Sequence, residues 1–263
     1  MKTLLSGSYD LYINNSCNLS CKNCSVLDYG GNVTIPNLKL DDVKEIISNL
    51  ESNNLIVDEL KIVGGEPTIH KDFKIIVDYL STKRDCYNTL TLVTNGLRFT
   101  DDVVNVCKVF DIIRVSEYNE LGDIKHHIKN SVAYKKLIKH SKVLFYPTST
   151  FQIYGEKGGT ERFGNSQEDS LYTKELNYER CWQHEDCLAL TKEGIYRCVI
   201  TMNERIEVVE WNSAEDVNKD EPLNRCETCY WFPREETWSS LNIKKDIKNY
   251  KRAISILDKT KLI

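Results

Sequence analysis

The sequence has no long apolar run. No stretch approaches the roughly 20 residues that a membrane-spanning helix needs, and the first ten residues, MKTLLSGSYD, lack the apolar core of a signal peptide. A basic excess is also missing, because the formal net charge is −4 and the isoelectric point is about 5.8. Nucleic-acid-binding proteins usually carry such an excess. We therefore expect a cytoplasmic protein with no membrane partner and no general nucleic-acid partner.

Cysteine, in contrast, is plentiful. The chain has 10 cysteines in 263 residues, and in a reducing compartment cysteines serve metals more often than disulfides. Hydrophobic residues make up 41% of the chain, which is enough for a sizeable core. The length suits one barrel-sized domain with a small appendage.

The first three cysteines form a C-x3-C-x2-C loop directly after a short apolar strand predicted at 11–13. They are Cys17, Cys21 and Cys24. Three thiolates can hold three irons of a cubane cluster and leave the fourth iron open to another ligand. A structural zinc site needs four ligands, and no histidine or fourth cysteine lies near this loop. The spacing alone favours an iron–sulfur cluster but leaves zinc open.

A second motif lies forty residues further on. The apolar strand ending at Val63 runs into Gly64, Gly65, Glu66 and Pro67. Two glycines let the backbone approach a ligand closely, and a carboxylate can accept hydrogen bonds from an ammonium group held there. Together with the cysteine loop, this segment resembles the radical S-adenosylmethionine (radical SAM) superfamily, whose members carry the same two motifs after their first and second strands.

The resemblance implies a cofactor set. The three cysteines would hold a 4Fe–4S cluster whose open iron binds the methionine moiety of SAM. The Gly64–Glu66 segment would line the methionine end, with Glu66 facing the amino group. Reduction of the cluster, by a flavodoxin- or ferredoxin-type donor, would cleave SAM to methionine and a 5'-deoxyadenosyl radical that removes a hydrogen atom from the substrate. One departure is Asn23, which stands where the family usually has an aromatic residue.

Apolar periodicity predicts strands that alternate with helices. This alternation implies parallel pairing with right-handed crossovers. With the resemblance, it predicts an α/β fold built as a partial (β/α)6 TIM-like barrel. The predicted strands cover 58–63, 89–96 with its closing turn, 112–116 and 143–146, and the predicted helices cover 38–50, 72–83, 101–109 and 123–140.

Ligands of such sheets bind at the carboxyl ends of the strands. Thr94, Asn95 and Ser116 fall on that edge, and the resemblance makes them candidate contacts to the SAM ribose and carboxylate. An ordinary turn and a strand-end hydroxyl are the alternatives for Asn95 and Ser116. Glu117 and Tyr118 lie slightly further along, where they face either substrate or solvent. These two are the candidate catalytic residues.

A second set of cysteines follows residue 180. Cys181 and Cys187 precede a predicted β-hairpin that starts at Leu188 and ends near Cys198, and a C-x2-C clip follows at 226–229. Four or five cysteines arranged in this way can enclose a second metal. Zinc and an iron–sulfur cluster both suit the pattern.

This cysteine set resembles the twitch domain, a shortened SPASM domain that binds one auxiliary 4Fe–4S cluster. The resemblance assigns the ligands as Cys181, Cys198, Cys226 and Cys229, with Cys187 as an alternative ligand. The turn glycine precedes Cys198 by three intervening residues where four are usual.

Three segments are expected from these patterns. Residues 1–154 form the barrel core, 155–177 a glycine-rich linker or lid, and 178–263 a small α+β twitch-like cluster-binding domain with a C-terminal helix. Cys86 and Cys107 have no metal-like spacing, so we expect them to be small buried hydrophobic residues.

The favoured hypothesis is a radical SAM enzyme of oxidoreductase type that acts on a small polar metabolite, such as a sugar, cyclitol or nucleoside. The auxiliary cluster would accept an electron after hydrogen abstraction, by analogy with related domains. Because Cys17 comes almost at once in the sequence, we expect no leader-binding domain before the barrel, which argues against peptide maturation. The alternatives are modification of a peptide or protein side chain or a nucleic-acid base, and a non-catalytic zinc or iron–sulfur binding module.

Overall fold

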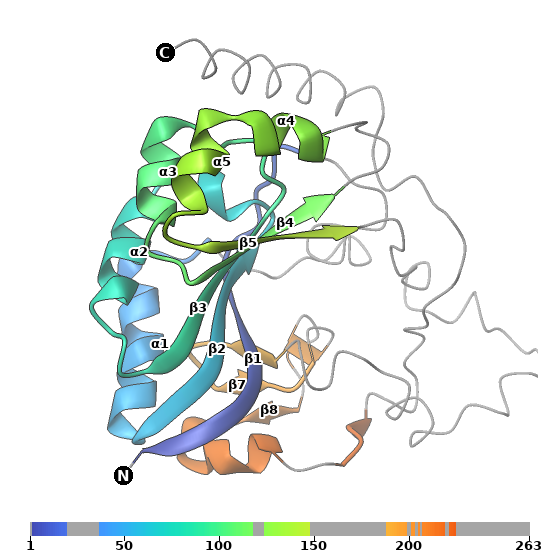
Figure 1. The fold of residues 1–263 in the computed structure, drawn as a ribbon. Coiled ribbons are helices and arrows are strands. Elements are labelled where there is room, and N and C mark those ends of the chain that lie inside the picture. The colour runs from blue at the N-terminus through green and yellow to red at the C-terminus, as the bar shows by residue number, and fades with distance from the viewer. Residues whose placement is uncertain are drawn as a thin grey trace, which may run out of the picture.

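The computed structural model describes residues 2–19, 37–117, 124–147, 188–198, 201–202, 205, 207–218 and 221–224. Their strands form one eight-stranded sheet in the order β5-β4-β3-β2-β1-β6-β7-β8. Helices lie along one face of the curved part of this sheet (Figure 1). The parallel strands follow the chain order from β1 to β5, so the predicted α/β fold with a parallel, barrel-like sheet is confirmed.

The elements have the following bounds. The parallel strands are β1 (Thr3–Asn14), β2 (Leu55–Gly64), β3 (Tyr87–Thr94), β4 (Ile112–Glu117) and β5 (Lys142–Pro147). The helices are α1 (Leu40–Ser52), α2 (Phe73–Ser81), α3 (Asp101–Cys107), α4 (Ile124–Asn130) and α5 (Val132–Leu137). Short 3-10 helices cover Pro67–Ile69 and Trp211–Asn218.

The helix-covered face of the sheet is apolar, and we call it the outer face. Alternate residues of the central strands, such as Leu60, Ile62, Leu90 and Leu92, are fully buried there. Strand residues two apart point to the same face, so one alternating pattern places all of them under the helices. Each helix contributes a matching apolar stripe, as in α1, whose buried residues are Val43, Ile46, Ile47 and Leu50.

The prediction of a single helix at 123–140 is wrong, because the structure has two helices that are separated at Ser131. The Ser131 hydroxyl accepts a 3.1 Å hydrogen bond from the Tyr134 amide, and it donates a 2.7 Å bond to the Ile128 carbonyl. A serine in this position caps a new helix instead of continuing the old one. The apolar periodicity on both sides of Ser131 concealed the break.

The predicted hairpin is present as β6 (Leu188–Leu190) and β7 (Ile195–Tyr196), which pair antiparallel. β6 also pairs parallel with β1, with Tyr9 opposite Leu188, and β8 (Val208–Val209) follows β7. The hairpin therefore continues the sheet of the barrel beyond β1. The segment boundaries expected at 154 and 178 stay a prediction.

Among the described helices, none combines the length and the apolar character that crossing a membrane requires. Cys86 and Cys107 are both fully buried in the core, as predicted. Burial raises the pKa of the Cys86 thiol to about 11, so at neutral pH this side chain behaves as a small apolar group.

Candidate active site

The chain just before Cys17 packs directly against the Gly-Gly-Glu segment. The Gly65 amide donates a 2.9 Å hydrogen bond to the Asn14 carbonyl, and the Glu66 amide donates a 2.8 Å bond to the Ser16 carbonyl. The Asn14 side chain is buried and its Nδ2 donates to the carbonyls of Ser16 and Glu66 at 3.2 and 3.1 Å. These bonds hold the start of the loop, just before Cys17, against the end of β2.

The two glycines make this approach possible. Gly64 has a φ of +155°, and a Cβ at this position would collide with Asn14. A Cβ at Gly65 would collide with the Ser16 carbonyl carbon and oxygen. Within the described residues, the close approach predicted for the glycine pair is therefore made to the chain's own backbone where it enters the cysteine loop.

Two N–H groups point at the thiol of Cys17. The Leu19 amide donates to Sγ at 3.3 Å, and the Asn95 side chain donates from Nδ2 at 3.8 Å. Hydrogen bonds to sulfur favour the thiolate, which is the form that binds iron. Cys17 and its surroundings thus fit a cluster ligand, and Cys17 would supply one of the thiolates that hold a 4Fe–4S group. The predicted partners Cys21 and Cys24 lie outside the described residues.

Glu66 lies in the interior, where it is 1% exposed. Its Oε1 accepts hydrogen bonds from the Thr68 amide, the Thr68 hydroxyl and the Thr94 hydroxyl at 3.1, 2.6 and 2.7 Å. Its Oε2 accepts a 2.7 Å bond from the Asn95 amide. Burial raises the pKa of the Glu66 carboxyl above its usual value, while the four donors act in the opposite direction. The carboxyl group joins the end of β2 to the end of β3.

The other predicted cofactor residues are placed along the same edge. Thr94 and Asn95 are buried at the end of β3, and Ser116 and Glu117 are half-buried at the end of β4. Tyr118 lies outside the described residues. The structure thus brings the cysteine loop together with Glu66, Thr94 and Asn95. The assignment of these residues to SAM stays a prediction.

The face of the sheet opposite the helices, which we call the inner face, carries charged residues that the sequence analysis missed. Lys61 on β2 lies 2.8 Å from Asp10 on β1, and both side chains are about 95% buried. Tyr12 donates a 3.1 Å hydrogen bond to the second oxygen of Asp10. Burial raises the pKa of the Asp10 carboxyl, and the Lys61 ammonium acts against this rise.

A second ion pair lies beside the first. The Arg114 guanidinium on β4 contacts both carboxylate oxygens of Glu59 at 2.9 Å, and the hydroxyls of Ser8 and Thr91 donate to the same carboxylate. We call these residues the inner-face cluster: Ser8, Asp10, Glu59, Lys61, Thr91 and Arg114. The alternation of Glu59 and Lys61 with Leu60 and Ile62 was the available signal for it, because a charged residue at every second position marks a polar face.

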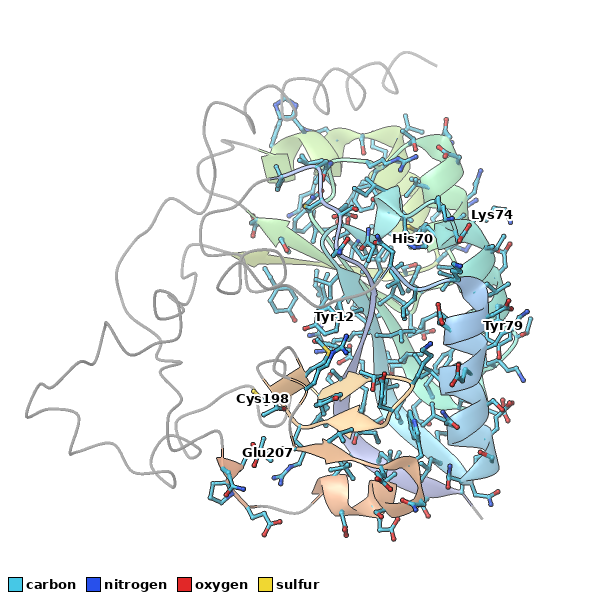
Figure 2. All side chains as sticks on the ribbon, turned by 180° about the vertical axis from the view of Figure 1, so that it is seen from behind. Tyr12, His70, Lys74, Tyr79, Cys198 and Glu207 are labelled. Atoms are coloured by element: carbon cyan, nitrogen blue, oxygen red, sulfur yellow. The ribbon has the colours of Figure 1, made fainter. Side chains whose placement is uncertain are left out.

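A cavity of about 360 Å³ lies between β1 and the hairpin, and Tyr12, one of its walls, connects it to the inner-face cluster by the hydrogen bond to Asp10. Tyr12, Leu38, Tyr196, Met202 and Arg205 are among its walls. Figure 2 shows Tyr12 and Cys198 on the same side of the sheet, away from Tyr79 on the outer helix α2. The walls thus combine apolar surface with a phenol and charged groups, as small-molecule pockets usually do.

Cys198 lies two residues after the end of β7, and its side chain is half-buried. The Met202 amide and the Thr201 hydroxyl donate to its carbonyl at 3.1 and 2.8 Å. The other cysteines predicted for the auxiliary cluster lie outside the described residues; they are Cys181, Cys187, Cys226 and Cys229. The auxiliary metal site therefore stays a prediction.

Glu51, Asp85 and Cys86 also bring three possible ligand atoms within 4.8 Å of one another. Lys83 pairs with Glu51 at 2.7 Å and Lys2 pairs with Asp85 at 2.8 Å. These ammonium groups already supply the positive charge that a metal would bring. This group is therefore explained by surface ion pairs.

A parallel sheet with helices on one face, and a cysteine loop held against a Gly-Gly-Glu segment at its carboxyl edge, define the class of this protein. Residues 11–116 match the radical SAM superfamily. Residues 11–116 thus carry a radical SAM domain, and this family of enzymes implies a 4Fe–4S cluster and SAM as cofactors.

Curated relatives share part of the sequence. The chain is 38% identical over 88 residues to the S-adenosylmethionine-dependent nucleotide dehydratase of Selenomonas ruminantium, a match that covers 33% of this chain and 29% of the relative. It is 31% identical over 94 residues to the GTP 3',8-cyclase of Pasteurella multocida, covering 35% and 27%. The chain thus matches less than a third of the length of either relative.

The crystal structure of BtrN in complex with AdoMet and 2-DOIA is similar over most of the fold. The TM-score is 0.57, and the match covers 92% of this chain and all of BtrN at 13% sequence identity. At this identity the likeness concerns the fold, and it agrees with the barrel-like sheet described above.

Proposed function

We propose that this protein cleaves SAM reductively and uses the resulting 5'-deoxyadenosyl radical to take a hydrogen atom from a small polar metabolite of the sugar, cyclitol or nucleoside type. The net reaction is an oxidation or dehydrogenation that an auxiliary 4Fe–4S cluster assists. Cys17, Cys21 and Cys24 hold the SAM cluster. Glu66 and the Gly64–Gly65 backbone support the methionine end of SAM.

The observation that carries this proposal is the polar inner face beside the cysteine loop. In a barrel-like sheet, ligands bind at the carboxyl ends of the strands, and here the inner-face cluster comes from the same strands as the cofactor motifs. Its two carboxylates are matched by two cations at 2.8 and 2.9 Å. Arg114 is still 28% exposed while it pairs with Glu59, so its guanidinium can donate hydrogen bonds to a substrate rich in hydroxyl groups, and the paired cluster adds no excess of either charge.

Nucleoside derivatives are favoured among the three substrate types. Both curated relatives described above have names that refer to nucleotides. The matches cover only part of each relative, so they support the substrate class and do not define the reaction. The fold neighbour BtrN was solved in complex with AdoMet and 2-DOIA, which supports the proposal that a barrel of this fold holds a second small molecule together with SAM.

The second metal centre belongs to the proposal as well. Cys198 lies on the same side of the sheet as Tyr12, which lines the cavity (Figure 2). The proposed ligands of this cluster are Cys198, the C-x2-C clip at 226–229, and either Cys181 or Cys187. Such a cluster can accept an electron from a substrate radical. A flavodoxin- or ferredoxin-type donor and a cytoplasmic location stay predictions.

Anaerobic reconstitution tests the proposal. The protein should contain about eight irons with both clusters, and about four after Cys198→Ala, because each cubane holds four. With dithionite and SAM it should form 5'-deoxyadenosine, and Cys17→Ala should abolish this product. Absence of 5'-deoxyadenosine from iron-loaded wild-type protein would refute the proposed chemistry.

The substrate class has a separate test. Deuterated nucleosides, cyclitols and sugars are offered together with SAM, and deuterium in 5'-deoxyadenosine is measured by mass spectrometry. Transfer from a member of this panel supports the proposal. Transfer only from deuterated peptides would replace the small-metabolite substrate with a peptide.

A further inference from the structure

The side chain of Asn95 reaches from the end of β3 to the cysteine loop, seventy-eight residues earlier in the chain. Its Nδ2 lies 2.7 Å from Asn18 Oδ1 and 3.8 Å from Cys17 Sγ. The residue is 5% exposed, so water has little access to it. An amide NH2 group has two hydrogens, and these two contacts account for both.

The other polar atoms of Asn95 fix this orientation. Its Oδ1 accepts a 3.0 Å hydrogen bond from the Leu97 amide, and its backbone amide donates to Glu66 at 2.7 Å. The bond from Leu97 identifies Oδ1 as the acceptor, which leaves Nδ2 on the side of the sulfur. Asn95 is therefore held from both ends, by the turn after β3 and by the carboxyl group of Glu66.

When Cys17 is a thiolate, the neighbouring side chain of Asn18 also requires the Asn95 Nδ2 to face the sulfur. In the protonated form the Cys17 thiol contacts Asn18 Oδ1 at 3.8 Å. A thiolate has no proton to give, and the carbonyl oxygen of Asn18 would then face a negative sulfur. The Asn95 NH2 group donates to both the oxygen and the sulfur, so it relieves this repulsion.

From this geometry we infer that Asn95 is a positioning residue for the SAM cluster: it holds Cys17 in place and raises the midpoint potential of the cluster by donating a hydrogen bond to the Cys17 thiolate. This inference rests on the proposed function, since it takes Cys17 as a cluster ligand. Hydrogen bonds to cluster sulfurs set the potential because they stabilise the more negative, reduced state. The inference assigns the side chain to the cluster and not to the ribose or carboxylate of SAM.

Two substitutions remove the donor in different ways. Asn95→Asp has nearly the same shape and keeps the oxygen that accepts from Leu97, but it replaces Nδ2 with an anionic oxygen. Asn95→Ala removes the donor without adding charge. The midpoint potential of the one-electron 4Fe–4S couple, measured by an anaerobic redox titration with electron paramagnetic resonance, should shift to a more negative value in Asn95→Ala. The shift should be larger in Asn95→Asp, because a negative charge near the cluster opposes reduction further.

Thr94→Val is the matched control. Thr94 is the neighbouring residue of the same turn, and its hydroxyl donates to Glu66 at 2.7 Å but not to sulfur. Thr94→Val loses two buried hydrogen bonds in this turn, the one to Glu66 and the one that Thr94 accepts from the Gly96 amide, so any general loosening affects it as well. Its cluster potential should stay at the wild-type value. A shift equal to that of Asn95→Ala would overturn the specific role of Asn95.

The remaining outcomes are also decisive. An unchanged potential in both Asn95 variants, at wild-type iron content, would overturn the inference while leaving the proposed function intact. Weaker SAM binding at an unchanged potential would return Asn95 to the role of a SAM contact. Loss of iron from both variants, with unchanged circular dichroism and melting temperature, would support the positioning role. Wild-type protein without a reducible cluster would refute the proposed function itself.

Discussion

The outer and inner faces of the same strands have opposite chemistry. On β2, Leu60 and Ile62 are fully buried under the helices, whereas Glu59 and Lys61 point to the inner face and form ion pairs. Burial of apolar side chains stabilises a fold, but a buried ion pair is weak evidence for stability, because desolvation offsets the attraction between its charges. The comparison teaches that the outer face holds the sheet together, while the inner face is the part to which the proposed function assigns substrate binding.

The largest effect should come from breaking the inner-face ion pair on one side. Lys61→Ala leaves the buried carboxylate of Asp10 without its cation, and we expect a loss of about 3 to 5 kcal/mol in unfolding free energy. The double variant D10N/K61M removes both charges and should lose far less. Urea unfolding followed by circular dichroism measures both. Equal losses in the two variants would show that the ion pair itself stabilises the fold.

A smaller effect is expected on the outer face one residue further along. Ile62→Ala removes buried methyl groups under the helices and should cost about 2 to 4 kcal/mol. Iron content and the yield of 5'-deoxyadenosine should stay at wild-type values when measured well below the unfolding temperature. A marked loss of product from this folded variant would contradict the division of labour between the two faces.

The smallest effect concerns a carboxylate at the surface of the outer layer. Asp42 near the start of α1 accepts a 2.8 Å hydrogen bond from the Lys39 amide and lies 3.0 Å from the Lys192 ammonium in the hairpin turn. These two donors hold the pKa of Asp42 below its usual value. A carboxylate in such a capping position contributes about 1 kcal/mol, which Asp42→Asn should lose at pH 7.

The pH dependence of this difference has a definite sign. Because the folded pKa lies below the unfolded one, Asp42 stabilises the protein above the unfolded pKa of about 3.9 and loses this contribution as pH falls through the folded pKa. Urea midpoints of wild type and Asp42→Asn should therefore differ at pH 7 and approach each other as the pH falls below about 3.9. A constant difference over this range would mean that the charge of Asp42 is not involved.

Many of the helices and strands could be predicted from the apolar periodicity of short segments. The apolar residues of α1 at Val43, Ile46, Ile47 and Leu50 recur at helical spacing, and this helix was predicted within two residues at either end. The hairpin at 188–196 was predicted from its alternation and its turn. The break at Ser131 was missed, because a capping serine competes with an apolar periodicity that continues on both sides.

The residues of the inner face were harder to predict for a physical reason. The strand β1 begins at Thr3, well before the apolar stretch that was expected to form it, because Ser8 and Asp10 interrupt the apolar pattern. These polar residues belong to a buried strand only because Glu59 and Lys61 lie opposite them across the sheet. Propensity along one segment contains no information on such a partner.

The sequence by itself determined the class of this protein, because the spacing of three cysteines and the Gly-Gly-Glu segment after a strand are properties of short stretches of chain. The tertiary structure alone decided which distant side chains meet. The parallel register places Asp10 beside Lys61, the curvature of the sheet places Arg114 over Glu59, and the turn after β3 places Asn95 at Cys17. Such contacts depend on strand order and register, which are settled when the whole sheet assembles.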